Sequence, residues 1–443
     1  MGSVYISFLG LGSMSTVDSR YKYSPASYSL NGAVSELTEF VQAAEIQLLG
    51  SSFFDRIIII ATEKSRDAHY ASLKGQLAAL GAVEPGLIII DEDMTPEGQW
   101  KWFEEILFHI DTGDRLTVDL THGYRSIPIV FSTAINFLRK AKNITVDGVY
   151  YGAFEKNRKC SPIIDMKDFY IINDWAEAVS RLVEDADARK LGDVAKQSSA
   201  FQAGDLNDPE LIEAFHALTG AIRNVDINNV GAMASKALGL VAGKKMTTSR
   251  TGSLLLDLVV DKFTAIAVSG NEGGEYIREY YTMQMEFVRL LIDHRLYMQA
   301  FTVMREFIVS FADMHARTAV RNDTELAGSK QKKYLDYSRK WFADLFLGMI
   351  ITKRKDWNFS RGHDKDGVRY LKYMVPLYDR LEEAGLVEIL GEFVSSLTEY
   401  RNGFDHAWTA SGGMPDDIDT KGRKFFVEMC RITEMLRSKG FLE

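Results

Sequence analysis

The stretch RIIIIAT, residues 56–62, decides the fold class of this 443-residue chain. Successive side chains of a strand point to opposite faces, so four consecutive isoleucines make both faces apolar. A short apolar run rich in β-branched residues is typical of a strand covered on both sides, as in a parallel sheet. The run LIIID, residues 87–91, repeats the pattern.

Strand and helix patterns alternate on both sides of these runs. Strands are predicted at residues 4–10, 56–62, 87–91, 114–123 and 144–154. Helices are predicted at residues 35–50, 99–110 and 127–142. This alternation predicts an α/β domain, Rossmann-like, with a doubly wound and mostly parallel sheet.

The pattern changes to helical after about residue 165. Helices are predicted at residues 174–197, 208–225, 251–270, 291–313 and 419–440, with a loop at 411–419. We therefore expect three regions: an α/β domain at 1–165, a helical linker region at 166–280 without a readable motif, and an all-α C-terminal domain at 281–443.

Composition excludes several classes of protein. The net charge of −9 argues against duplex DNA as a partner, because duplex binding needs many Lys and Arg contacts to phosphates. The two cysteines, Cys160 and Cys430, lie far apart and predict neither a disulfide framework nor a thiolate metal site. The N-terminus has no basic start, and no apolar run approaches the ~20 residues of a membrane span. We expect a soluble, cytoplasmic protein with no membrane contact.

A candidate ligand site follows the predicted strands, because open parallel sheets bind ligands beyond the carboxyl ends of their strands. The candidate residues are Gly10, Leu11, Gly12, Ser13, Thr62, Thr121, His122, Gly123, Tyr124 and Arg125. The glycines allow the backbone to approach a ligand closely. The hydroxyls and the Arg125 guanidinium can donate hydrogen bonds to phosphate oxygens. A base can stack on the Tyr124 ring.

Two other nucleotide sites fit these residues less well. A dinucleotide fingerprint would need glycine where Ser15 stands, and an acidic residue at the end of the next strand. An NTPase would need a G-K-[ST] loop, which the sequence lacks. A lone histidine such as His122 would more often bond to the backbone of its own turn than act on a ligand.

A second candidate site lies in EYRNGFDHAW, residues 399–408, where Arg401 and His406 stand five residues apart. In a continuous helix they would lie about 140° apart around the axis. We expect Gly403 to weaken the helix, so that a turn brings both side chains to the entrance of one site. Such a pair suits RNA cleavage without a metal: histidine moves protons, and arginine stabilises charge on phosphorus. Asn402 is expected to hold phosphate or orient the histidine.

The segment upstream of this motif is expected to have a structural role rather than a catalytic one. Residues 291–313 have the pattern of a helix packed in a bundle, so Arg305 and Glu306 are expected to serve structure or to orient the site. The chain has no H-E-x-x-H and no paired histidines at metal-ligand spacing, so no metal is expected.

Three stretches together resemble the CRISPR-associated CARF–HEPN ribonucleases, accessory effectors of type III systems. SFLGLGS (7–13), with the tyrosines Tyr21, Tyr23 and Tyr28, resembles the start of the CARF domain. DLTHGYRSIP (119–128) resembles its loop signature after the fourth strand. RNGFDH (401–406), preceded by YMQAFTVMRE, resembles the HEPN motif.

The resemblance implies a mechanism. A CARF dimer binds a cyclic oligoadenylate, for which the family favours the tetra-adenylate over the hexa-adenylate. Binding activates a HEPN dimer, which cuts single-stranded RNA without a metal and leaves a 2′,3′-cyclic phosphate. Arg401, Asn402 and His406 would form the catalytic site, composed from both protomers, so a homodimer or a higher oligomer is implied. The ten residues of the candidate ligand site would hold the activator.

Three alternatives stay open. The chain could be a nucleotide sensor without nuclease activity. It could degrade its own activator, with Thr62, Ser13 or His122 involved. It could also be an oxidoreductase that uses the first glycine turn for a dinucleotide, although the fingerprint is incomplete.

Overall fold

The computed structural model describes residues 2–14, 20–93, 95–122, 127–155, 158–197, 206–268, 278–358, 368–409 and 413–442. The chain divides into two compact units, Met1–Asn173 and Asp174–Glu443. The division falls within helix α6 (Lys167–Asp185). The boundary that we place at about residue 280 stays a prediction.

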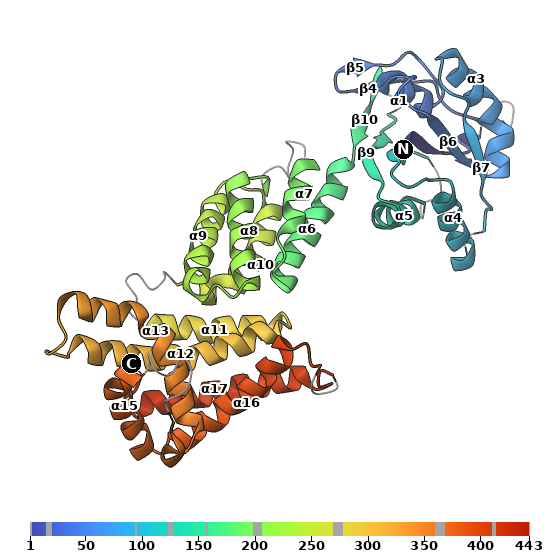
Figure 1. The fold of residues 1–443 in the computed structure, drawn as a ribbon. Helices are drawn as coiled ribbons and strands as arrows, with labels where there is room; N and C mark the ends of the chain where they lie inside the picture. Colours follow the sequence, from blue (N-terminus) through green and yellow to red (C-terminus); the bar gives the residue numbers. More distant parts are fainter. Residues whose placement is uncertain are drawn as a thin grey trace. The chain divides into compact units, whose positions relative to one another are not determined.

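An eight-stranded sheet forms the first unit, in the order β5-β4-β10-β9-β8-β1-β6-β7 (Figure 1). The parallel strands are β1 (Ser3–Leu9), β6 (Arg56–Ala61), β7 (Gly86–Ile89), β8 (Arg115–Asp119) and β9 (Thr145–Gly152). At one edge lie β10 (Cys160–Asp165), antiparallel to β9, and then β4 (Ser27–Leu30) and β5 (Ala33–Val34). A separate ribbon pairs β2 (Ser13–Met14) with β3 (Tyr21–Lys22).

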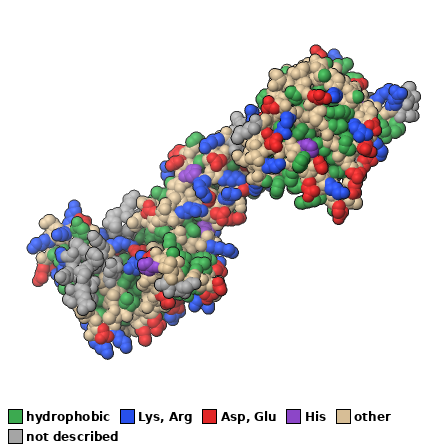
Figure 2. Space-filling view, turned by 45° about the vertical axis from the view of Figure 1, so that its right-hand side comes forward, with side chains coloured by type: hydrophobic (Ala, Val, Ile, Leu, Met, Phe, Trp, Pro, Cys, Tyr) green, Lys and Arg blue, Asp and Glu red, His purple; other side chains and the backbone are tan. Residues whose placement is uncertain are grey.

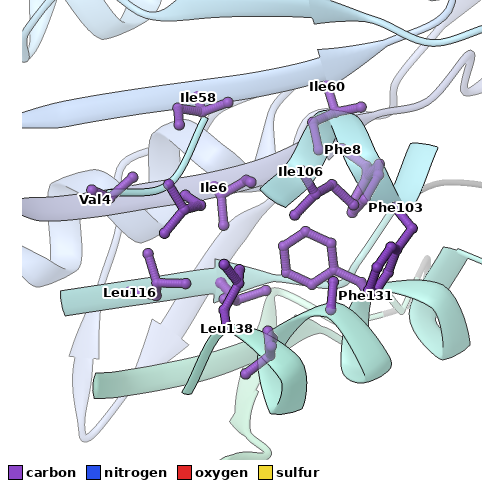
Figure 3. Packing of buried hydrophobic residues seen from close by; sticks show 14 of the residues in the cluster. Val4, Ile6, Phe8, Ile58, Ile60, Phe103, Ile106, Leu116, Phe131 and Leu138 are labelled. Carbon is purple, nitrogen blue, oxygen red and sulfur yellow. The ribbon is translucent and has the colours of Figure 1, made fainter. Parts of the chain in front are cut away.

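Helices cover both faces of the sheet, because the apolar runs are apolar on both sides. Ile58 and Ile60 pack with Val4, Ile6 and Phe8 against one layer of helices (Figure 3). That layer is α4 (Pro96–Phe108) and α5 (Ile127–Ala141). Ile57 and Ile59 pack on the opposite face, against α1 (Val41–Leu49) and α3 (Ala71–Ala79). The predicted doubly wound α/β class is therefore confirmed.

The first unit differs from the prediction in several places. The helix expected at 35–50 begins only at Val41, because the chain before it stays extended and Thr38 bridges to Ala26. Helix α3 and the short strands β2, β3 and β5 were not predicted. Strands β4 and β10, which lie between β5 and β9, were not predicted either, since each carries polar residues or a proline.

The second unit is helical in all the regular structure that its described residues form. Its helices are α7 (Arg189–Gln197), α8 (Pro209–Arg223), α9 (Ile227–Lys245), α10 (Arg250–Phe263), α11 (Arg278–Asp293), α12 (Tyr297–Arg321), α13 (Gly328–Ile351), α15 (Leu371–Glu383), α16 (Val387–Asp405) and α17 (Ile418–Ser438). The predicted all-α region after the α/β domain is confirmed. The helices expected at 174–197 and 291–313 are each interrupted, at Ala186 (φ 49°) and at Arg295 (φ 56°), where the backbone is left-handed.

Charges are mixed on the surface. On the face drawn in Figure 2, basic and acidic side chains are interspersed rather than separated into fields of one sign. A site for a polyanion would therefore depend on a few local cations. Within the described ranges, no helix combines the length and the apolar character needed to cross a membrane.

Candidate functional sites

The first candidate site lies where the order of the sheet reverses. From β1 the chain builds β6 and β7 on one side and then returns to add β8 on the other. The connections that follow β1 and β8 therefore run in opposite directions, and open α/β sheets bind ligands at such a point. Gly10–Ser13 and Thr121–His122 follow these two strands, as predicted. Gly123, Tyr124 and Arg125 lie outside the described residues.

The glycines of the first loop let other parts of the site approach closely. A Cβ on Gly10 would lie 3.1 Å from the Tyr23 hydroxyl and 3.5 Å from the Cβ of His122. Gly12 has φ +70°, and a Cβ there would lie 2.5 Å from the Lys22 carbonyl oxygen. Larger residues at these two positions would push the β2–β3 ribbon away from the loop. Leu11 contributes its carbonyl oxygen, 2.9 Å from the His69 Nε2 atom.

A cluster of aromatic side chains packs against this loop. The Tyr23 ring lies 4.8 Å from the rings of both His69 and His122, and 5.5 Å from Phe40. Burial raises the pKa of Tyr23 and lowers the pKa of His122, so both rings are held neutral around neutral pH. Sequence reasoning missed His69, because no motif singles out a histidine that only the fold brings to the first loop.

Thr121 is fixed by a buried carboxylate. Its backbone N–H donates to the Asp119 Oδ1 atom at 2.8 Å, and its hydroxyl accepts from the Gly152 N–H at 2.7 Å. The Ser7 hydroxyl donates to the other Asp119 oxygen at 2.6 Å. Burial raises the pKa of Asp119, and the neighbouring His122 offsets part of that rise. The end of β8 is thereby tied to β1 and β9, which fixes where the following loop begins.

Thr62 serves mainly as a helix cap. Its hydroxyl accepts from the Ser65 N–H at 3.2 Å, and the Ser65 hydroxyl oxygen accepts from the Thr62 N–H at 3.0 Å. Reciprocal bonds of this kind satisfy the free donors of a helix start. The side chain is buried, so the Thr62 hydroxyl is committed to its own turn.

A second buried carboxyl, Glu45, projects from α1 toward β1. Glu45 is fully buried, and the Tyr5 hydroxyl donates to its Oε2 atom at 2.7 Å. Burial raises the pKa of Glu45 well above its usual value, the charge of Asp119 raises it further, and the Tyr5 bond lowers it in part. The folded protein therefore holds a proton that the unfolded chain releases above about pH 4.3.

This proton predicts how stability depends on pH. The free energy of unfolding should fall as the pH rises from about 4.3 toward the folded pKa of Glu45, because there the folded state binds more protons than the unfolded state. Glu45→Gln removes this contribution, so its thermal midpoint should fall less than that of the wild type between pH 5 and pH 8. The exposed Glu36→Gln is the matched control. Equal slopes for wild type and Glu45→Gln would contradict the assignment.

The second candidate site lies at the end of α16. Arg401 and Asn402 are in its last turns, and His406 is its C-cap residue, with its N–H donating to the Asn402 carbonyl at 2.9 Å. The Arg401 guanidinium meets the Asp405 carboxylate at 3.0 Å. The expectation that Gly403 weakens the helix was wrong: α16 continues through it, and the chain turns only at Ala407 (φ 49°) and Trp408 (φ 57°).

Gly403 instead makes room for an aromatic side chain. A Cβ on Gly403 would lie 2.4 Å from the ring of Trp408. The Trp408 ring packs edge-on against Phe404 at 5.2 Å and Tyr400 at 6.1 Å, and the backbone N–H of Trp408 donates to the Gly403 carbonyl at 2.7 Å. The chain thus folds back over the last turn of α16, and His406 lies at the turning point.

Helix α12 packs against this segment. Its Phe301 ring lies 5.8 Å from Tyr400 and 6.1 Å from Phe404. One turn later, Glu306 pairs with Arg305 at 3.0 Å and with Arg339 of α13 at 2.8 Å. These contacts agree with the predicted structural role of Arg305 and Glu306. In the described part of the chain, no group of three or more His, Cys, Asp or Glu side chains is arranged to hold a metal ion.

Comparison with known proteins points to CRISPR-associated proteins. No protein-family model matches the chain. It is 22% identical over 274 residues to CRISPR-associated protein MJ1674 of Methanocaldococcus jannaschii, an alignment that covers 47% of this chain and 43% of the relative. The chain thus spans less than half the length of that relative. The resemblance to CRISPR-associated proteins inferred from the motifs is confirmed at this level.

Several solved structures are similar in fold, and one of them aligns with the whole chain. It is Enterococcus italicus Csm6 bound to cyclic hexa-2′-fluoro-hexa-dAMP, with a TM-score of 0.47 and 10% sequence identity. The match covers 100% of this chain and 95% of that protein.

Proposed function

We propose that this protein is a single-stranded RNA endoribonuclease that a cyclic oligoadenylate activates, works without a metal, and serves type III CRISPR defence. One observation supports the proposal most. Two unrelated motifs occur in one chain, each in a different unit: the glycine loop meets Thr121–His122 at the switch point of the sheet, and Arg401 and His406 stand at the end of a helix of the all-α unit. The CRISPR-associated relative supports the same context.

The activator would bind at the switch point of the sheet in the first unit. Backbone N–H groups of Gly10–Ser13 can approach phosphates because the glycines carry no side chain. The Arg125 guanidinium would donate two parallel hydrogen bonds to a phosphate, and adenine would stack on the Tyr124 ring. We favour the cyclic tetra-adenylate. A ring with two-fold symmetry fits an isologous dimer, in which each protomer offers the same loop.

The cleavage step would use the end of α16. The ribose 2′-hydroxyl attacks the adjacent phosphorus, the bond to the 5′-oxygen breaks, and the products are a 2′,3′-cyclic phosphate and a 5′-hydroxyl. His406 would take the proton of the attacking hydroxyl or give one to the leaving oxygen. Arg401 would stabilise the charge that develops on the phosphate oxygens, and Asn402 would hold or orient the reacting groups.

A homodimer would complete the catalytic site. Five residues on a helix separate two side chains by about 140°, so Arg401 and His406 of one chain point in different directions. A site composed from two copies of the α16 end does not need them to converge within one protomer. Exposed apolar side chains on α4 and α5 also support self-association: Trp100, Phe108, Ile129 and Phe137.

The products and the metal requirement test this function. RNA cleaved in the presence of activator and EDTA should carry 2′,3′-cyclic phosphate ends, identified by mass spectrometry. Cleavage that requires Mg²⁺, or that leaves 5′-phosphate ends, would contradict the mechanism.

Arg125 provides a test of the activator site. Arg125→Ala should raise the activator concentration for half-maximal cleavage on the order of 10- to 100-fold, because a charge-assisted bidentate contact is lost. The maximal rate at saturating activator should stay unchanged. Arg139→Ala, in the last turn of α5 and away from the loop, is the matched control. An unaltered activator response would remove Arg125 from the site.

A second function is favoured by one feature, the neutral His122 beside the first loop. An imidazole there could assist cleavage of the bound ring, so the protein would degrade its own activator. Chromatography of the activator after incubation distinguishes the two functions: a ring that is opened without any RNA cleavage would favour this alternative.

A further inference from the structure

A groove lies between α16 and α17, which run side by side in the second unit (Figure 1). Its volume is about 380 Å³. Its walls at the end nearer Arg401 are Phe393 and Ser396 of α16 and Lys421, Lys424 and Phe425 of α17. The groove therefore combines ammonium groups, a hydroxyl and aromatic rings at this end, whereas its other end carries Glu392 and an ion pair between Glu428 and Arg431.

The two lysines differ from two arginines of the same helix, Arg423 and Arg431. Arg423 meets Asp419 at 3.4 Å, and Arg431 meets Glu428 at 2.5 Å. Lys421 and Lys424 form no ion pair with any residue in the described ranges. They stand one helical turn apart, where Cβ atoms lie about 5–6 Å from each other. The two charges can therefore meet neighbouring anionic groups of one extended ligand.

The groove ends beside the helical turn that carries Arg401. The Phe425 ring of its wall lies 5.4 Å from the ring of Tyr400, the residue just before Arg401. Ser396 and Arg401, five residues apart, lie about 140° apart around the axis, so Arg401 itself is not part of the groove wall.

We propose that this groove binds the single-stranded RNA beside the bond that is cut, with Lys421 and Lys424 on successive phosphates and the Phe425 ring against a base. The proposal rests on the function proposed above and adds the path of its substrate. Sites for single-stranded nucleic acid pair a cationic groove with an aromatic face, and this groove has both. A protein helix is the poorer occupant, because it would bury two ammonium groups that have no partner.

The test is the double variant Lys421→Ala/Lys424→Ala, compared with Lys330→Ala/Lys439→Ala. The control removes the same charge from exposed positions of the same unit that do not line the groove. With activator present, the groove variant should raise KM for RNA on the order of tenfold while kcat stays within about twofold, since lost binding that is shared by substrate and transition state appears in KM. The control should behave as wild type.

Binding is measured in parallel in a His406→Ala background, which leaves the RNA intact. The slope of log affinity against log salt should become shallower by about 0.7 for each lost phosphate contact, about 1.4 in all. Thermal midpoints equal to wild type would show that the variant is folded.

Each result has a distinct meaning. Unchanged KM and salt slope in an active enzyme would overturn the groove and leave the proposed function in place. A wild type that binds RNA through the groove but never cuts it would overturn the function instead. Loss of the dimer in the groove variant, seen by analytical ultracentrifugation, would show that the groove is an interface between copies.

Discussion

His406→Ala is expected to abolish activator-dependent RNA cleavage, lowering the rate roughly 10²- to 10⁴-fold, because proton transfer by a positioned side chain contributes about that much. His406 caps α16, and its imidazole lies outside the hydrogen bonds that end the helix, which use backbone atoms. The substitution should therefore leave the thermal midpoint nearly unchanged. A fluorogenic single-stranded RNA assay measures the rate.

Two controls separate chemistry from folding and from activation. Activator affinity, measured by calorimetry, should be equal in His406→Ala and wild type, since the candidate ligand site belongs to the other unit. His109→Ala removes a half-buried imidazole from the end of α4, outside both candidate sites, and should cleave at the wild-type rate. Full cleavage by His406→Ala would exclude His406 as the proton carrier.

Gly403→Ala is expected to reduce cleavage on the order of 100-fold, although alanine is the better helix former. In an exposed helix the change would stabilise by roughly 0.5–1 kcal/mol. Here the new Cβ would lie 2.4 Å from the Trp408 ring, and overpacking costs about 1–3 kcal/mol. The steric cost is the larger, so Trp408 must move and the turn that holds His406 moves with it. A misplacement of about 1 Å can cost 10²-fold in rate.

A double variant tests this explanation. Trp408→Ala removes the ring that the new Cβ would meet, so Gly403→Ala should cost much less stability in a Trp408→Ala background than in wild type. Thermal and urea unfolding of the four proteins give the coupling energy. Additive effects would show that the Trp408 ring does not determine the requirement for glycine at position 403.

The sequence predicted the parts of the fold that local pattern determines. The run at 56–62 is apolar on both faces, so a doubly wound sheet was predictable from one strand. Strands β4 and β10 were not, because short polar strands are specified by the neighbours with which they pair. The breaks at Ala186 and Arg295 were missed because neither residue is a usual signal for a left-handed turn.

The candidate sites were predictable to a similar extent. Residues after the strands, such as Gly10 and Thr121, could be named because parallel strands end at one edge of the sheet. His69 could not, since its contact with Leu11 spans a large stretch of chain. The role of Gly403 was misjudged because glycine is ordinarily a helix breaker, whereas here it accommodates the ring of Trp408.

The most direct test of the central claim is a fluorogenic single-stranded RNA assay in EDTA, with cyclic tetra-adenylate, cyclic hexa-adenylate or no ring, on wild type and His406→Ala. The account predicts that wild type cuts RNA only when a ring is present, with the tetra-adenylate the stronger activator, and that His406→Ala does not cut with either. RNA cleavage that needs no ring, or none with either ring, would contradict it.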